Sequence, residues 1–199
     1  MTLPTSYFDQ IYAASTDPWG FATRAYEARK YAITLACLPR ARYRRAFEPG
    51  CSIGVFTRLL AARVDEVVAS DSSCQALELA RAQGQPSNVE FVCHALPKEW
   101  PKGRFDLIVF SEVGYYLDTA DLDRFVALAA TSLDPDGHLV AVHWRMPVAD
   151  YPQSGEEVHA RLRMVSSLAP LAHYEDVHFL LDVFGSSDRA ALQGPESSA

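Results

Sequence analysis

The fold is decided by the stretch from Arg45 to Gly54, Arg-Ala-Phe-Glu-Pro-Gly-Cys-Ser-Ile-Gly. An amphipathic run comes next, and then an apolar segment, Val67 to Ala69, leads into Ser70 and Asp71. This order predicts a strand, a tight glycine turn, a helix and a second strand that ends in a single carboxylate. Such a unit holds a nucleoside cofactor in an α/β sheet, so the cofactor is the first thing to identify.

The glycine turn lacks the middle glycine of a pyrophosphate-binding turn. Ser52 stands there, between Gly50 and Gly54, and its Cβ obstructs close approach of a pyrophosphate to the backbone. S-adenosylmethionine (SAM) carries a carboxylate, an ammonium, a sulfonium and an adenosine but no pyrophosphate, so the turn favours SAM. Ser52, together with the absence of a Tyr-x-x-x-Lys pair in the right region, disfavours an NAD-dependent oxidoreductase.

Two carboxylates accompany the turn. Asp71 follows the first glycine by about twenty residues, the spacing at which an acidic residue binds the two ribose hydroxyls. Its alternative role is to cap the next helix, because the residues from Ser70 to Ser73 all have capping side chains. Glu48 is either an ordinary charge at a strand end or a neighbour of the cofactor's ammonium. Both alternatives stay open for both residues.

Further apolar segments follow in the order expected for an α/β sheet. The predicted strands are Val89–His94, Phe105–Ser111 and Gly137–Trp144. The predicted helices are Val55–Val64, Ser73–Gln83 and Asp121–Leu133, the last ended by Asp134 to Gly137. Nearly continuous apolar strands suit a parallel sheet that is covered on both faces. We therefore predict one doubly wound α/β domain.

The composition is that of an ordinary globular protein with one substantial core: 199 residues, 49% hydrophobic and 22% charged. A formal net charge of −7 argues against a duplex nucleic acid partner and tolerates a cationic substrate. Basic residues cluster between Arg24 and Arg45, and we interpret them as a solvated face. No apolar run has the length of a membrane span, so no membrane partner is expected.

The four cysteines are Cys37, Cys51, Cys74 and Cys93. They form neither a C-x-x-C pair nor a zinc pattern, and no signal peptide precedes them. We expect reduced thiols, a cytoplasmic protein and no metal. The stretch from Gly185 to Ala199, rich in Ser, Gly and Ala, is predicted to be a flexible tail.

From Asp17 to Asp118 the chain resembles the class I SAM-dependent methyltransferases and, more narrowly, the NodS family of nodulation N-methyltransferases. The resemblance is carried by Asp17–Trp19, Tyr26–Tyr31, Thr34–Ala36, Leu38-Pro39, Arg42–Gly54 and Phe105–Leu117. It implies the class I methyltransferase fold, a Rossmann-like, mostly parallel sheet of about seven strands with an N-terminal helical lid. It also implies SAM as cofactor and methyl transfer to the free amine of a deacetylated glucosamine at one end of a chitooligosaccharide.

With this resemblance, residues 1–184 are expected to form a single methyltransferase domain. Residues 1–46 would be the helical lid, 47–144 the SAM-binding core, and 145–184 the acceptor side with a last strand near Val177–Phe184. We expect a monomer or weak homodimer that acts on a small-molecule or oligosaccharide amine.

The expected cofactor contacts come from the turn, the strand ends and the lid. They are Trp19, Tyr26, Arg29, Glu48, Gly50, Cys51, Ser52, Gly54, Asp71, Ser72, His94, Ala95, Leu96, Ser111 and Glu112. Related enzymes place an aspartate against the adenine amine after the third strand. This chain has none there, so His94 or a backbone carbonyl must substitute. Arg29 is the candidate partner of the methionine carboxylate, and its alternative is a surface arginine on an amphipathic helix.

Methyl transfer from a sulfonium requires donor and acceptor at near-attack distance, exclusion of water and a neutral amine. An aminosugar ammonium titrates near neutrality, so a weak general base suffices. The candidates are Glu112 and His143, at the carboxyl rim of the sheet, and His159, on a helix over that rim. Structural or solvated histidines are the alternative.

The candidate acceptor contacts are Tyr116, Trp144, Arg145, Asp150 and Tyr151. Aromatic rings stack on pyranose faces and a carboxylate holds hydroxyls or an ammonium, whereas rim packing and a turn aspartate are the alternatives. Other functions left open are an O-methyltransferase acting on another small molecule and a non-catalytic protein that binds SAM or S-adenosylhomocysteine (SAH). The polar rim favours an enzyme.

Overall fold

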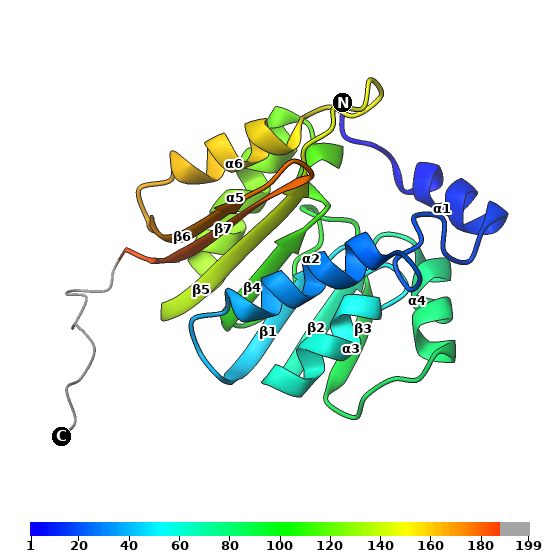
Figure 1. Cartoon of the computed structure of the whole chain (residues 1–199), viewed down its shortest axis with the longest axis horizontal. Coiled ribbons are helices and arrows are strands. Elements are labelled where there is room, and N and C mark those ends of the chain that lie inside the picture. Colours follow the sequence, from blue (N-terminus) through cyan, green and yellow to red (C-terminus); the bar gives the residue numbers. More distant parts are fainter. Residues whose placement is uncertain (188–199) are drawn as a thin grey trace.

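A seven-stranded sheet with the strand order β3-β2-β1-β4-β5-β7-β6 forms the centre of the computed structural model, which describes residues 1–187 (Figure 1). The strands are β1 (Tyr43–Pro49), β2 (Val64–Asp71), β3 (Val89–Cys93), β4 (Phe105–Ser111), β5 (Leu133–Trp144), β6 (Leu168–Glu175) and β7 (Phe179–Ser186). Strands β1 to β5 are parallel, whereas β7 runs antiparallel to both β5 and β6. The predicted fold class is confirmed.

Helices cover both faces of this sheet (Figure 1). They are α1 (Thr5–Ala14), α2 (Ala25–Ala36), α3 (Val55–Leu60), α4 (Cys74–Ala82), α5 (Thr119–Ser132) and α6 (Gly155–Arg163), with short 3-10 helices at Ala61–Arg63 and Gly114–Tyr116. Helices α2, α3 and α4 pack on one face, and α5 and α6 pack on the other. None of the described helices combines the length and apolarity that a membrane crossing requires.

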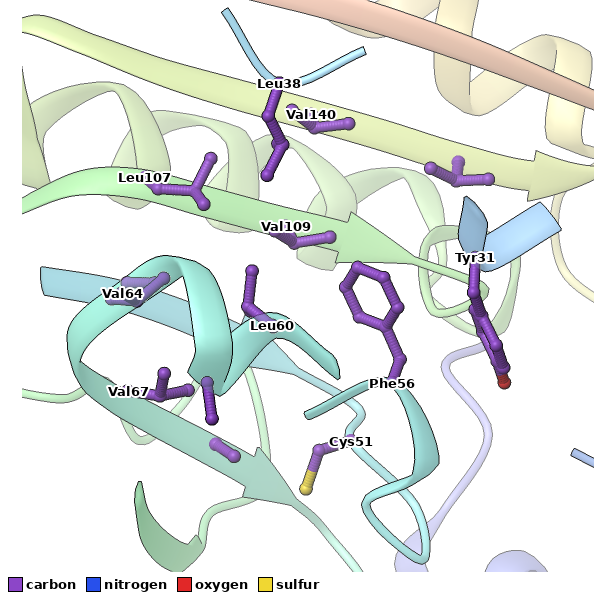
Figure 2. Packing of buried hydrophobic residues seen from close by; sticks show 14 of the residues in the cluster. Tyr31, Leu38, Cys51, Phe56, Leu60, Val64, Val67, Leu107, Val109 and Val140 are labelled. Atoms are coloured by element: carbon purple, nitrogen blue, oxygen red, sulfur yellow. The ribbon is translucent and has the colours of Figure 1, made fainter. Parts of the chain in front are cut away.

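The core consists of an apolar cluster on each face of the sheet. Along β4, Leu107 and Val109 belong to the cluster beneath Phe56 of α3 (Figure 2), whereas Ile108 and Phe110 belong to the opposite cluster. All four strand residues are completely buried. Successive side chains of a strand point to opposite faces, so a strand covered on both sides has to be apolar throughout.

Two predicted boundaries are wrong. Strand β1 begins at Tyr43, inside the segment assigned to the lid, because Tyr43 is buried and pairs with Val64 of β2. Gly185 and Ser186, assigned to the tail, belong to β7, where Gly185 pairs with His138 of β5. The residues 188–199 of the predicted tail lie outside the described residues.

The carboxyl-terminal half of the sheet differs from the prediction in two further ways. Strand β5 begins at Leu133, and its partners in β4 jump from Phe105 opposite Leu133 to Leu107 opposite His138. The predicted turn residues between them therefore form a bulge within a strand. Strand β6 was not predicted, because it is an edge strand whose side chains are mostly exposed.

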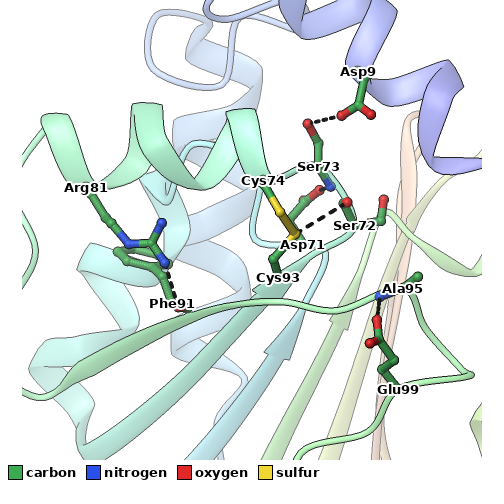
Figure 3. Close-up of a disulfide and its surroundings, with 10 residues drawn as sticks. All are labelled: Asp9, Asp71, Ser72, Ser73, Cys74, Arg81, Phe91, Cys93, Ala95 and Glu99. Atoms are coloured by element: carbon green, nitrogen blue, oxygen red, sulfur yellow. Dashed lines mark hydrogen bonds between the residues drawn. A yellow bond between two sulfur atoms is a disulfide. The ribbon is translucent and has the colours of Figure 1, made fainter.

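Cys74 and Cys93 form a disulfide, which corrects the prediction of reduced thiols for this pair (Figure 3). The parallel pairing of β2 with β3 places Cys93 opposite Asp71, and α4 begins at Cys74 shortly after that aspartate. The Cα atoms of the two cysteines are 5.4 Å apart. Only the tertiary structure brings them together. Cys37 and Cys51 are free thiols, as expected.

Candidate functional site

A cavity of about 710 Å³ lies at the carboxyl edge of the sheet. Residues that end or follow strands form its floor, among them Gly50 after β1, Asp71 at the end of β2 and Glu112 after β4. Its cover comes from the N-terminal segment, which contributes Tyr12 of α1, Trp19, and Tyr26, Glu27 and Lys30 of α2. Ligands of open α/β sheets bind at this edge.

The turn after β1 has a left-handed backbone at Gly50, Ser52 and Gly54, with φ angles of 69°, 52° and 73°. A Cβ on Gly50 would lie 2.1 Å from Cγ2 of Val113, so only glycine lets the loop after β4 pack against the turn. The hydroxyl of Ser52 is hydrogen-bonded to that of Tyr12 at 2.5 Å. This hydrogen bond links helix α1 to the turn.

Asp71 forms the wall of the cavity next to this turn. Its Oδ2 accepts a hydrogen bond from the N–H of Ser52, and its Oδ1 accepts one from the N–H of Ser73, both at 2.9 Å. Burial raises the pKa of Asp71 to about 6 in spite of these hydrogen bonds. Each carboxylate oxygen has a second lone pair for a ligand. Asp71 therefore supports the chain ahead of α4 and faces the cavity as well.

Several buried polar atoms at this edge have no hydrogen-bond partner among the described residues. The hydroxyl of Tyr26 and Nδ1 of His94 belong to residues that line the cavity. Oε2 of Glu48 belongs to a small adjoining pocket. Burial raises the pKa of Glu48 to about 8. Because buried polar atoms in proteins are normally paired, a polar ligand is the expected partner.

Glu112 is the centre of a buried charge cluster. Its backbone is left-handed, with a φ of 58°, and its carboxylate accepts from Nζ of Lys30 at 2.7 Å, from the N–H of Trp144 at 3.1 Å and from the hydroxyl of Tyr115. Nζ of Lys30 also lies 2.9 Å from Oε2 of Glu27. Two acidic side chains share one ammonium in the wall of the cavity, so this wall has an excess of acidic groups.

Burial and the neighbouring charges shift the pKa values of Glu27 and Lys30 in opposite directions. Burial raises the pKa of Glu27, and the contact with Lys30 offsets only part of that rise. Burial alone would lower the pKa of Lys30, but Glu112 and Glu27 outweigh it, so the pKa of Lys30 is raised. Lys30 is therefore a cation at neutral pH, although its side chain is only 2% exposed.

The two candidate histidines lie outside the cavity wall, and neither imidazole is exposed. The N–H of Gly114 donates to Nε2 of His143 at 3.1 Å, so the proton of this ring is on Nδ1, which lies 3.1 Å from Nε2 of His159. Nδ1 of His159 then donates to Oδ2 of Asp182 at 2.7 Å. Burial, with His159 and Lys30 nearby, lowers the pKa of His143 far below its ordinary value. The structure removes both histidines from the candidate bases.

Three other predicted site residues also lie away from the cavity. Arg29 points outward on α2, with Nη1 2.7 Å from Oδ2 of Asp176, and it does not line the cavity. Arg145 pairs with Glu156 at 3.0 Å. Asp150 is exposed and does not line the cavity. All three belong to the solvated surface.

The other predicted residues do gather at this edge. Those lining the cavity are Trp19, Tyr26, Gly50, Ser52, Asp71, Ser72, His94, Ala95, Leu96, Glu112, Tyr116, Trp144 and Tyr151. Those lining the adjoining pocket include Glu48, Cys51 and Ser111. Gly54 lies behind the turn as the N-cap of α3.

Sequence reasoning missed Tyr12, Glu27 and Lys30, all of which line the cavity. A signal for two of them exists. The buried residues of α2 are Glu27, Lys30, Tyr31 and Thr34, which have the spacing of the inward face of a helix. Charged residues at those positions indicate a buried polar site.

Comparisons with known proteins agree with this geometry. The family model of Nodulation protein S (NodS) matches residues 10–165. Nodulation protein S of Bradyrhizobium diazoefficiens is 33% identical to this chain over 130 residues, which are 64% of this chain and 62% of that protein. The chain matches 55% to 62% of the length of its curated relatives.

Solved structures are similar over more of the chain. A protein of Pseudomonas syringae, described as a candidate methyltransferase, is 47% identical with a TM-score of 0.72, over 81% of this chain and 99% of that one. The N-methyltransferase NodS of Bradyrhizobium japonicum WM9, solved with SAH, has a TM-score of 0.81 over 92% of this chain and 98% of its own. At 23% identity, this second likeness shows the fold alone.

The family model covers well over half of the 199 residues, and it includes the glycine turn, Asp71 and Glu112. The predicted family is confirmed: the chain belongs to the NodS family.

Proposed function

We propose that this protein is a SAM-dependent N-methyltransferase that methylates the free amine of a small acceptor, a deacetylated amino sugar or chitooligosaccharide. The observation that carries the proposal is the left-handed turn from Gly50 to Gly54 beside Asp71, which opens into a cavity whose wall has an excess of acidic groups. Such a turn admits a nucleoside without a pyrophosphate, and such a wall favours cations.

The chemical groups of SAM match the polar atoms at this edge. Asp71 would bind the ribose hydroxyls, Glu48 would hold the methionine ammonium with its unpartnered Oε2, and His94 would lie at the adenine. Arg29 points outward and Lys30 is already paired with Glu27 and Glu112, so neither cation of α2 is assigned to the methionine carboxylate in this proposal. The relative solved with SAH supports the choice of cofactor.

When bound, SAM supplies an electrophilic methyl group for an in-line displacement by the nitrogen of the acceptor. The residues of the chain position the two reactants and exclude water. Tyr12, anchored to Ser52, and Trp19, packed on Tyr12 with ring centroids 5.6 Å apart, would cover the donor. Tyr115 and Tyr151, stacked at 5.2 Å, lie on the acceptor side, where Tyr151 offers its ring to a sugar face.

The charge cluster favours an amine over a hydroxyl acceptor. Glu27 and Glu112 share one ammonium, that of Lys30, so a cationic acceptor would balance the remaining negative charge. A neutral hydroxyl would leave it unbalanced in a buried wall. The N-methyltransferase activity of the NodS relative from Bradyrhizobium japonicum supports the same choice.

A pair of matched acceptors tests the proposal. The protein is incubated with methyl-labelled SAM and either a chitooligosaccharide with one free amine or its fully N-acetylated twin. We expect label only in the free-amine compound, detected by mass spectrometry, and micromolar SAH binding by calorimetry. SAH binding without transfer to any amine would favour the non-catalytic alternative, and label on the acetylated twin would favour an O-methyltransferase.

The proposal includes action in the cytoplasm as a monomer or weak homodimer. A stable disulfide is unusual in that compartment. Cells lysed in a thiol-blocking reagent would show whether Cys74 and Cys93 are paired there. Complete pairing in the cell would argue for an oxidising location.

A further inference from the structure

Three hydrogen-bond donors surround the carboxylate of Glu112. Its carboxylate already accepts hydrogen bonds from the ammonium of Lys30, the hydroxyl of Tyr115 and the N–H of Trp144. His143 and His159 are hydrogen-bonded to each other and do not line the cavity, so neither is placed to reach an acceptor there.

Glu27 has fewer hydrogen-bond donors than Glu112, namely Lys30 and Tyr31, and both lie on its own helix. It lines the same cavity and is only 5% exposed, and the charged atom against it is Nζ of Lys30, at 2.9 Å. The titratable groups that face it are Tyr26, Lys30 and Tyr31 from its own helix and Glu112 from the loop after β4. Burial raises its pKa, and the nearby negative charge of Glu112 adds to that rise. A buried carboxylate that gains by taking up a proton has the property of a general base.

We propose, resting on the proposed amine methylation, that Glu27 is the catalytic base and that Lys30 and Glu112 are the residues that position it. The ammonium of the acceptor enters the cavity beside Glu27. One N–H bond of that ammonium breaks and an O–H bond forms on Glu27, which leaves the lone pair of the nitrogen free to attack. No oxidant, reductant or further reactant is needed.

Charge balance supports this assignment. Before the transfer, the two carboxylates face the ammonium groups of Lys30 and of the acceptor, so the site is neutral. After the transfer, Glu27 and the amine are neutral, and Lys30 and Glu112 still form an ion pair at 2.7 Å. The proton therefore moves without leaving an unpaired charge in the buried wall.

The test compares the pH dependence of methyl transfer in the wild type and in Glu27→Gln. The amide keeps the size of the side chain and an oxygen for Lys30, but it accepts no proton. We expect kcat near pH 7 to fall about 100-fold, the lower range for loss of a general base. The loss should shrink as the pH rises above the pKa of the acceptor amine, because the amine then arrives neutral. The affinity for SAH should stay within about threefold.

Two further variants complete the experiment. Glu27→Asp retains a carboxylate and should recover part of the lost rate with the pH profile of the wild type. Glu78→Gln, on the exposed side of α4, is the matched control and should change nothing. Thermal melting of each variant verifies folding.

The inference is overturned if Glu27→Gln retains its turnover, if its loss is equal at every pH, or if SAH affinity falls in parallel with the rate. The last result would place Glu27 in the donor site. A wild type that binds SAH but methylates no free amine overturns the proposed function. An active wild type with an unaffected variant overturns only the role of Glu27.

Discussion

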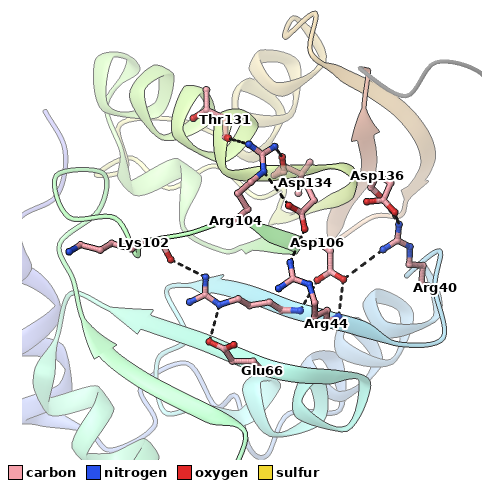
Figure 4. Close-up of polar contacts among 11 residues, drawn as sticks. Arg40, Arg44, Glu66, Lys102, Arg104, Asp106, Thr131, Asp134 and Asp136 are labelled. Carbon is pink, nitrogen blue, oxygen red and sulfur yellow. Dashed lines mark hydrogen bonds and ion pairs between the residues drawn. The ribbon is translucent and has the colours of Figure 1, made fainter.

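The two edges of the parallel sheet differ in whether their buried polar groups all have hydrogen-bond partners. At the amino edge, arginines and carboxylates form ion pairs with each other (Figure 4): Arg40 with Asp136 at 2.5 Å, Arg44 with Asp134 at 2.9 Å, Arg45 with Glu66 at 2.9 Å and Arg104 with Asp134 at 3.2 Å. At the carboxyl edge, buried polar atoms of Tyr26, Glu48 and His94 have no partner among the described residues. The amino edge satisfies its own charges, whereas the carboxyl edge requires a ligand.

Two aspartates make this comparison testable. Asp106 accepts hydrogen bonds from the N–H groups of Arg44 at 2.8 Å and Arg45 at 2.7 Å. Asp71 does the same for Ser52 and Ser73. Both carboxylates are nearly buried, at 6% and 9% exposure. They therefore have the same local role at opposite edges, and only Asp71 faces the cavity.

The largest expected effect is that of Asp71→Ala on SAH binding. Removing the acceptor of the ribose hydroxyls should weaken binding about 100-fold or more, since each hydrogen bond to a charged group contributes about 1.5–3 kcal/mol. Asp106→Ala should leave SAH affinity within about twofold. It should still lower the free energy of unfolding by about 2 kcal/mol, because two backbone N–H groups lose their acceptor. Calorimetry and urea unfolding measure both, and equal losses of affinity would contradict the comparison.

The next effect is the loss of stability on reduction of the disulfide at the carboxyl edge. Reducing the Cys74–Cys93 bridge, which spans 19 residues, should lower the free energy of unfolding by up to about 3 kcal/mol. Urea unfolding with and without dithiothreitol measures this. Cys37→Ser is the matched control, because Cys37 is a free thiol and should leave the reductant effect unchanged. A wild type that is insensitive to reductant would show that the bridge does not form.

The sequence predicts features that depend on neighbouring residues better than features that depend on tertiary packing. The glycine turn, the apolar strand Phe105–Ser111 and the carboxylate at Asp71 depend on neighbouring residues alone, and the structure has each of them in the predicted place. Turn conformation and strand burial are set by residue type and spacing, so a single sequence is enough to predict them.

The predictions are wrong where tertiary contacts set the orientation of a side chain. Arg29 and Lys30 are adjacent, but successive residues of a helix point about 100° apart, so only one of them faces the cavity. The seating of α2 on the sheet selects Lys30. His143 lies at the rim in sequence, yet its ring turns to His159 behind the cavity wall. Helical spacing would have indicated the inward position of Lys30, beside Tyr31 and Thr34, but nothing in the sequence indicates the orientation of His143.

A change in the pH dependence of stability, and not in stability at a single pH, is expected from the buried carboxyl group of Glu48. Its pKa in the folded protein, about 8, is above the value of an ordinary glutamate, so folding takes up a proton between about pH 4.5 and 8. Its contribution to stability is therefore complete below that range and falls as pH rises, by about 1.4 kcal/mol per pH unit. Glu48→Gln should flatten this slope in urea unfolding. The raised pKa of Asp71 adds the same slope to both proteins and cancels in their difference. Parallel pH curves for the two proteins would mean that Glu48 is ionised and partnered.

The smallest effect should come from an exposed ion pair at the amino edge. Arg42 lies 2.6 Å from Asp65, but the two side chains are 60% and 57% exposed. Exposed pairs contribute little, because water solvates the separated charges almost as well. Arg42→Ala should therefore change the free energy of unfolding by about 0.5 kcal/mol or less and leave SAH affinity unchanged. A loss as large as that of Asp106→Ala would mean that the exposed arginines of this edge stabilise the fold in their own right. The difference between the edges would then lie in the strength of the pairs and not in whether partners are present.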